Sequence, residues 1–234
     1  MKRLAVSAML FLLAVAAWAQ SPKAFGTVNY VENTVSIVRA GKPVKAPADI
    51  GDQLFPDDMI KTAGDSYVVI DLDKSTGMSG TLTIKPGSVV YLRLSPDATK
   101  PRSTIELIAG QIGSKLSKIS GSPTFQVSTE STVMGVRGTT FGVSAAVNGS
   151  ILITCTEGMV TANDGTMNVE VPAGKAAEKK PAERLRLVPV SVSTMEQFEA
   201  SWFADAIEAF RADPAKALRD YEKRYTDLSA KFAT

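Results

Sequence analysis

Short runs of β-branched and apolar residues, separated by glycine and polar turn residues, fill the chain from Phe25 to about Val171. Within residues 88–94, alternate positions carry Val or Leu, which is the period of a strand with one buried face. Asn148-Gly149 indicates a two-residue hairpin, because both central residues of such a turn need a positive φ. Closely spaced turn signals of this kind predict an all-β domain rather than alternating βαβ units.

Two arrangements of these strands remain open. Short strands joined by glycine turns can stack as a solenoid-like β-roll, or they can form a β-sandwich of two packed sheets. The recurrence of glycine turns throughout the region favours the roll.

The hydrophobic period changes after Thr194. Thr194 and Gln197 have the spacing of a capping box, and Asp213-Pro214 has the residues that begin a second helix. The sequence therefore predicts two amphipathic helices, at about 194–211 and 214–232, which follow the β domain. Their apolar stripes either pack on the protein itself or form an interaction surface, whose candidate residues are Phe198, Trp202, Phe210, Tyr221 and Tyr225.

The first nineteen residues have the pattern of a secretory signal peptide. Two basic residues precede an apolar run, Leu4 to Ala17, which ends in Ala17-Trp18-Ala19. The run is shorter than the ~20 residues that span a bilayer, although an uncleaved signal anchor stays an alternative. We therefore expect a periplasmic or secreted protein with no transmembrane segment after signal removal. The expected organisation is signal peptide 1–19, β domain 20–171, linker 172–193 with one possible strand, and helical tail 194–234.

Composition narrows the chemistry. The chain has no histidine and one cysteine, Cys155, so histidine-based catalysis, internal disulfides and zinc sites of paired cysteines are excluded. Lys2 and Arg3 account for the whole net charge of +2, and the remainder is neutral, which gives no electrostatic footprint for nucleic acid. We expect no cofactor, no metal and no catalytic residues, and Cys155 should be a buried structural thiol.

The segment from Ser131 to Val143 stands out because two glycines enclose a lone arginine. Gly135 and Gly138 can adopt a positive φ or allow a close backbone approach. Arg137, with five donors, either ties neighbouring turns together or binds a ligand carboxylate. The first role is the one we expect.

This segment resembles the hallmark of FecR-type domains, and other stretches match the same pattern in order over roughly residues 25–172. Two positions depart from it: Asp57 stands where the family has glycine, and Glu130 stands where it has proline. The residues that carry the resemblance are Gly51–Leu54, Asp57–Thr62, Phe125–Thr129, Gly135, Val136, Arg137, Gly138, Thr139, Phe141, Val143, Glu157, Gly158 and Val160.

The resemblance implies a non-catalytic binding or regulatory module of the cell envelope, possessing a signal peptide in place of the family's cytoplasmic anti-sigma segment. We expect it to dock an envelope protein or a surface polymer, with edge-strand pairing as one mechanism. A self-assembling structural envelope protein is one alternative. A glycoside hydrolase that uses only carboxylates, drawn from Asp49, Asp52, Asp57 and Asp58, is another.

Overall fold

The computed structural model describes residues 23–45, 47–74, 79–94, 102–117, 124–136, 138–190 and 194–213, together with Arg219. The expected signal peptide and the expected second helix, 214–232, lie outside these residues apart from Arg219. The described part is a mostly β structure followed by one helix, α2, at Met195–Ala212. Its strands are β1 (Gly26–Glu32), β2 (Val35–Arg39), β3 (Lys42–Lys45), β4 (Gln53–Leu54), β5 (Asp58–Thr62), β6 (Tyr67–Leu72), β7 (Ser79–Ile84), β8 (Val89–Leu94), β9 (Arg102–Ser117), β10 (Thr124–Ser128), β11 (Val133–Val136), β12 (Thr140–Ala145), β13 (Ile151–Glu157), β14 (Met159–Asn163), β15 (Asn168–Pro172), β16 (Lys175–Lys179) and β17 (Arg186–Val188).

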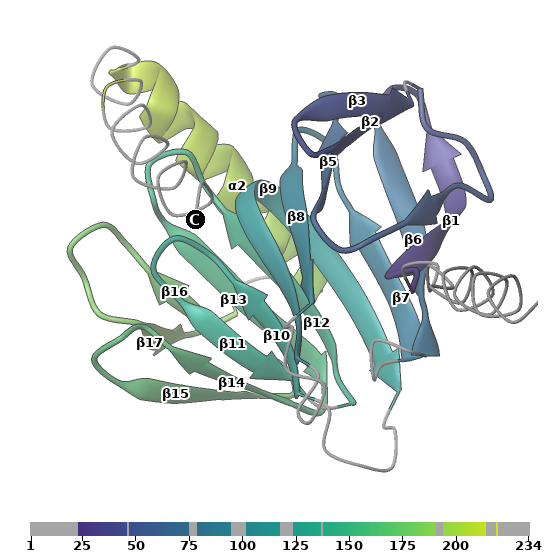
Figure 1. Ribbon diagram of the computed structural model, residues 1–234. Coiled ribbons are helices and arrows are strands. Elements are labelled where there is room, and N and C mark those ends of the chain that lie inside the picture. Colours follow the sequence, from purple (N-terminus) through teal and green to yellow (C-terminus); the bar gives the residue numbers. More distant parts are fainter. Residues whose placement is uncertain are drawn as a thin grey trace, which may run out of the picture.

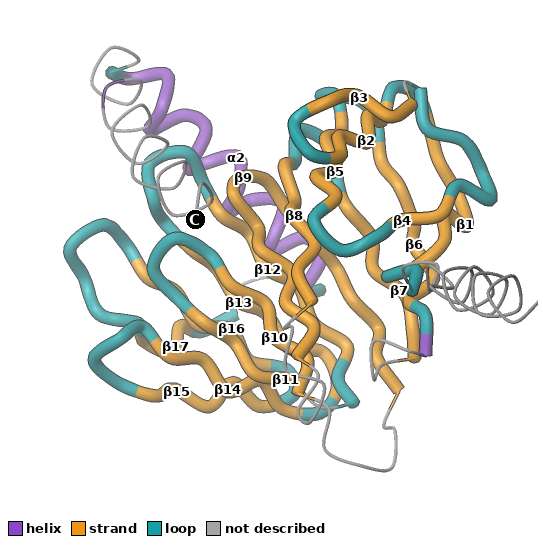
Figure 2. The backbone as a smooth tube through the Cα atoms, viewed as in Figure 1, coloured by secondary structure: helices purple, strands orange, loops and turns teal. Residues whose placement is uncertain are grey.

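The strands form two sheets that share one long strand, β9 (Figures 1 and 2). Sheet A has the order β4-β1-β6-β7-β9-β12-β13-β16-β17. Sheet B has the order β3-β2-β5-β8-β9-β10-β11-β14-β15. Among these pairs only β9–β10 is parallel.

The shared strand β9 changes sheet at Gly110. The residues before Gly110 pair with β8 and β10 in sheet B, and those from Gly110 onward pair with β7 and β12 in sheet A. Gly110 has φ +99°, and a Cβ there would lie 2.5 Å from the Cα of Ser88. Only glycine fits this bend, because an L side chain would meet both the wrong φ and the neighbouring backbone.

Other segments bend between the sheets in the same way, and the resulting two-armed ribbons stack in the same order in both sheets. Hydrogen bonds join successive corners: Ala63 donates its N–H to Thr34, and Gly87 donates to Ala63. Ser88 Oγ accepts from the N–H of Gln111 at 2.9 Å, which connects the β7–β8 corner to the bend in β9. The corners therefore form a hydrogen-bonded rim.

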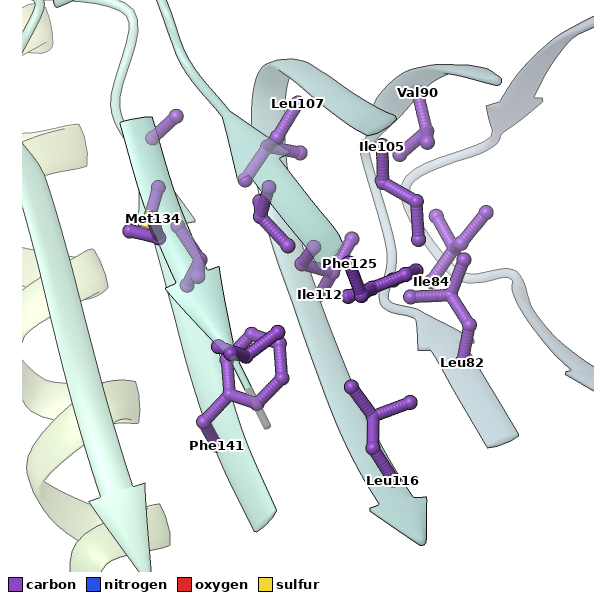
Figure 3. Packing of buried hydrophobic residues seen from close by; sticks show 14 of the residues in the cluster. Leu82, Ile84, Val90, Ile105, Leu107, Ile112, Leu116, Phe125, Met134 and Phe141 are labelled. Carbon is purple, nitrogen blue, oxygen red and sulfur yellow. The ribbon is translucent and has the colours of Figure 1, made fainter. Parts of the chain in front are cut away.

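One hydrophobic core lies between the two sheets. Each strand presents alternate residues to it, and the buried cluster draws on both sheets. Figure 3 shows Phe125 and Met134 of sheet B packed near Ile112 and Phe141 of sheet A. Burial of these large side chains supplies the main favourable contribution to folding, at about 25 cal/mol per Å² of apolar surface.

The expected all-β architecture is confirmed, but the solenoid-like roll is wrong. The combined sheet neither closes nor curls on itself, and successive strands pair almost entirely antiparallel. A solenoid instead coils the chain in one direction, so that equivalent strands of successive turns pair in parallel. The glycine turns that favoured the roll serve here as the corners of bent ribbons.

The segment 172–193, expected to be a linker, contributes two strands to sheet A, β16 and β17. The linker was expected to hold one possible strand, and it holds two. The sequence of β16, KAAEK, has the composition of a solvated segment, yet Ala176, Ala177 and Glu178 are all buried. The strand was not recognised because alanine is small and common in all kinds of structure. Larger apolar residues at these buried positions would have indicated a strand.

Asp164 ties the β14–β15 hairpin to the segment between β16 and β17. Its carboxylate accepts from the N–H of Leu185 at 3.0 Å, from the N–H and hydroxyl of Thr166, and from the N–H of Met167. The side chain is 1% exposed. These donors, the N–H of Leu185 foremost, hold the pKa of Asp164 well below its usual range.

We predict that Gly110→Ala lowers the free energy of unfolding by about 2–3 kcal/mol, because the new Cβ meets Ser88 and the backbone is held at a positive φ. Gly113→Ala, in the same strand, is the matched control, since no atom lies within 4 Å of its added Cβ. Urea unfolding of both variants measures the difference. Equal stability of the two would contradict the role of Gly110 as the bend.

We predict that Asp164 makes stability depend on acid pH. Because folding lowers its pKa, its contribution is complete above the unfolded value of about 3.9 and is lost as the pH falls toward the folded value. Asp164→Asn should lower the melting temperature at pH 7 and flatten the decline of melting temperature between pH 5 and pH 2. Parallel pH profiles for the two proteins would show that the carboxylate has no such role.

Candidate docking face on sheet A

The Gly-Val-Arg-Gly-Thr motif forms a corner between the sheets. Gly138, with φ +61°, lies between β11 and β12, and Gly158, with φ +83°, lies between β13 and β14. A Cβ on Gly158 would lie 2.7 Å from the Thr139 side chain and 2.8 Å from the carbonyl oxygen of Gly138. The two corners therefore pack directly against each other, and the motif acts as scaffold at these positions.

The remaining motif residues support the same corner. Val136 and Phe141 are buried in the core, and Thr140 donates its hydroxyl hydrogen to Glu157 at 3.0 Å. Gly135 lies in β11, opposite Gln126 and Thr161. Arg137 lies outside the described residues, so its expected role as a staple stays a prediction.

Asp58 holds the turn between β4 and β5. Its buried carboxylate forms a two-pronged ion pair with Arg39, at 2.6 and 2.7 Å, and accepts from the N–H of Phe55 at 2.8 Å. Arg39 also lies over the Phe55 ring, 4.6 Å from its centroid. This carboxylate, one of those considered for glycoside hydrolysis, is thus engaged in holding the turn.

The backbone conformation of Asp57 explains why aspartate can replace the glycine of the FecR pattern at this position. Its φ is +68°, a left-handed conformation that glycine adopts without strain and that aspartate tolerates better than most residues. The backbone therefore keeps the turn that the family's glycine would form.

The outer face of sheet A is covered by α2 over strands β12, β13 and β16. Most strands alternate buried and exposed residues, but residues 151–155 of β13 are all buried. Ile151, Ile153 and Cys155 belong to the core, so Leu152 and Thr154 point to the opposite face, where α2 contacts β13 (Figure 1). None of the helices in the described part is long and apolar enough to cross a membrane.

Two polar anchors hold α2 on this face. The Glu199 carboxylate accepts from the Lys85 ammonium group at 2.8 Å and from the Thr154 hydroxyl. One turn further along, the Trp202 indole N–H donates to Glu178 at 2.8 Å. Glu178 also pairs with Arg186 at 3.3 Å. The two carboxylates, Glu199 and Glu178, are largely shielded from water, so bonds to them are screened less than those of a surface ion pair.

A shallow trough with a glycine floor lies under the first turn of α2. Thr83, Gly113, Gly142 and Thr154 are successive cross-strand neighbours on the outer face of sheet A. A Cβ on Gly142 would overlap Glu199 and lie 2.8 Å from Thr154 Oγ1, whereas the space above Gly113 is open. The absence of a side chain at Gly142 is therefore what lets the Glu199 carboxylate reach Thr154.

Two cavities flank the covering helix. One, of about 310 Å³, lies between its first turn and the trough, and Lys85 and Lys115 line it. The other, of about 350 Å³, lies beside Trp202 and is also lined by Asp205, Asn148 and Lys180. The helix thus rests on its anchors without filling the space beneath it.

The structure describes only two of the five aromatic side chains expected to form an interaction surface. Phe198 and Trp202 are half-buried, and the Trp202 indole bonds to Glu178 of the β domain, which for Trp202 is the packing alternative that the sequence left open. The side chain of Phe210, and Tyr221 and Tyr225, lie outside the described residues. Cys155 is buried, as expected, and burial raises the pKa of its thiol.

Sequence reasoning missed the residues that position the helix: Lys85, Gly142, Thr154, Glu178 and Glu199. One signal was present, since the run ILITC in β13 is apolar or β-branched at every position and therefore predicts a strand buried on both faces. The partner of its second face could not be read from the sequence, because Lys85 and Glu199 are 114 positions apart.

Comparison with known proteins supports the resemblance. Residues 58–161 match the family model described as FecR protein, which places the match over β5 to β14. No curated protein matches the chain.

Two crystal structures of a protein described as a candidate anti-sigma factor from Parabacteroides distasonis ATCC 8503 are similar to the chain. Their TM-scores are 0.48 and 0.47, each at 14% sequence identity. The similarity covers 56% of this chain and 59% of the other, so the chain spans less than two thirds of that protein's length.

We predict that Asp57→Val lowers the free energy of unfolding by about 1–2 kcal/mol, because a β-branched residue is strained at this positive φ. Asp57→Gly should leave the stability within about 0.5 kcal/mol, since it restores the residue suited to the turn. Thermal unfolding of the pair measures this contrast. If valine and glycine were tolerated equally, the conformation at position 57 would not govern the turn.

Proposed function

We propose that the chain is a non-catalytic docking module of the cell envelope that binds a protein partner through the outer face of sheet A. The observation that carries this proposal is the trough on that face, where Gly113 lies under open space between threonine and lysine side chains, beside Gly142 under the Glu199 carboxylate. The FecR match over residues 58–161 supports a regulatory rather than a catalytic role.

The motif residues support docking over catalysis. Gly138 and Gly158 maintain corners, and Asp58 is neutralised by Arg39, so these groups build a rigid frame. A rigid frame with an open face is what preorganised binding requires, since little conformational entropy is then lost on association.

The uncovered part of the same face adds contact surface. Tyr30 and Tyr67 stack there with ring centroids 5.3 Å apart, and Tyr30 is 43% exposed. Exposed, rigid tyrosines are enriched at protein interfaces, because they bury a large area and lose little freedom. Val69, the cross-strand neighbour of Tyr30, connects this pair to the trough through Thr83.

The proposal also includes export of the protein from the cytoplasm. The basic start, short apolar run and Ala-Trp-Ala sequence of residues 1–19 support a periplasmic or secreted location. The family match and the name of the Parabacteroides protein suggest envelope signalling as the process. The outer face of sheet A provides a docking surface. The proposal is limited to docking and includes no anti-sigma activity.

Site-specific photo-crosslinking in the source organism tests this function. A photoreactive phenylalanine at position 30, on the uncovered face of sheet A, should crosslink to one envelope protein. The same group at Thr161, exposed on the outer face of sheet B, is the matched control and should give no such product. Crosslinks only between copies of this chain would favour the self-assembling structural protein, and crosslinks from position 161 alone would assign docking to the other sheet.

A further inference from the structure

We propose that α2 is a displaceable cover, and that the partner it makes way for presents an acidic amphipathic helix to the same groove. This inference rests on the proposed function and names the partner's chemistry. The groove already binds a helix, α2. This helix places a carboxylate, Glu199, over Gly142 and a tryptophan three residues later.

Charge complementarity favours an acidic helix. The face that receives α2 carries Lys85 and Lys115 near the first turn of the helix, Glu178 is paired with Arg186 near Trp202, and the helix itself is acidic. Four acidic residues and one basic residue lie in α2: Glu196, Glu199, Asp205, Glu208 and Arg211. A helix of similar charge from another protein would meet the same lysines.

Imperfect packing makes the cover displaceable. Trp202, which α2 turns toward the sheet, is only half-buried, and a cavity lies at each anchor. Both cavities open to solvent, so a helix whose side chains fill them would remove more apolar surface from water than α2 does, and would bind the groove more tightly. The two anchors fix where α2 lies, but most of its outer surface remains in water.

The two neighbouring glycines provide a test of the geometry. Gly142 lies under the Glu199 carboxylate, and Gly113, its cross-strand partner, lies under open space. Alanine at position 142 should obstruct any carboxylate that reaches for Thr154, whereas alanine at position 113 should not.

The experiment uses the full chain with Trp18→Phe, so that Trp202 is the single tryptophan, and with Glu199→Lys. This substitution places two lysines together and should release α2 while leaving the groove intact. We expect faster hydrogen exchange in α2 and a red shift of Trp202 emission, because its indole leaves Glu178. If α2 stays protected and the emission is unchanged, the cover is not held by this latch and the proposal is overturned.

Binding is then measured in trans with a fluorescein-labelled peptide of residues 194–213. The peptide should bind the Glu199→Lys chain at least tenfold more tightly than the unchanged chain, whose groove is occupied. Adding Gly142→Ala should abolish most of this gain, and adding Gly113→Ala should preserve it. Absence of peptide binding to a chain with released α2, or equal effects of the two alanines, would overturn the proposal.

Two further outcomes are informative. If Glu199→Lys prevents folding, Glu199→Gln removes the ion pair without repulsion and is tested in the same way. A dimer that forms without peptide, detected by size-exclusion chromatography, would identify a second copy as the occupant and contradict a partner helix. Failure of peptide binding together with a crosslink from position 30 would overturn this inference and leave the proposed function standing.

Discussion

The structure depends on one constraint: each ribbon must pass from one sheet to the other without leaving backbone polar groups unpaired. Gly110 meets this constraint inside β9, and Gly138 and Gly158 meet it between shorter strands. Where a side chain is present at such a point, as at Asp57, nearby hydrogen bonds and ion pairs hold the turn in place. The shared core can form only because these corners let both arms of each ribbon face inward.

The helix is attached by a different kind of interaction. Within the β domain, apolar side chains such as Phe125 and Ile112 interlock at full burial. On the outer face, α2 relies on Glu199 and Trp202, whose partners are polar and specific. Polar anchors fix position well but add little net stability, because each group gives up water to make its bond. The molecule thus combines a permanent core with a more weakly attached covering element.

Local patterns predicted much of the fold. Alternating residues revealed β8, and Thr194 caps α2 by accepting from the N–H of Gln197. Asn148-Gly149 revealed the β12–β13 hairpin, but the predicted two-residue turn is wrong: residues 146–150 connect the strands, and of the pair only Gly149 has a positive φ. The arrangement of the strands could not be predicted from the sequence, because the same glycine turns are compatible with a coiled solenoid and with a stack of bent ribbons. Which one forms depends on pairings between distant strands.

The candidate site was harder to predict than the fold. The Gly-Val-Arg-Gly-Thr motif drew attention to a corner, whereas the docking face uses residues with no distinctive motif, such as Lys85 and Gly142. Glycine in a strand usually signals a bend, and Gly142 instead makes room for a side chain from a remote helix. Gly113 and Gly142 form one trough only because the pairing of β9 with β12 places them side by side, and this pairing cannot be read from the sequence.

The shared strand β9 has a consequence for how the chain reaches its native state. Among the described pairings, β1 to β8 join β10 to β17 only through β9. A chain that folds from its N-terminus therefore keeps two open sheet edges, at β7 and β8, until β9 pairs with them. That strand then completes one half and serves as template for the other, so the assembly of both layers proceeds outward from the middle of the sequence.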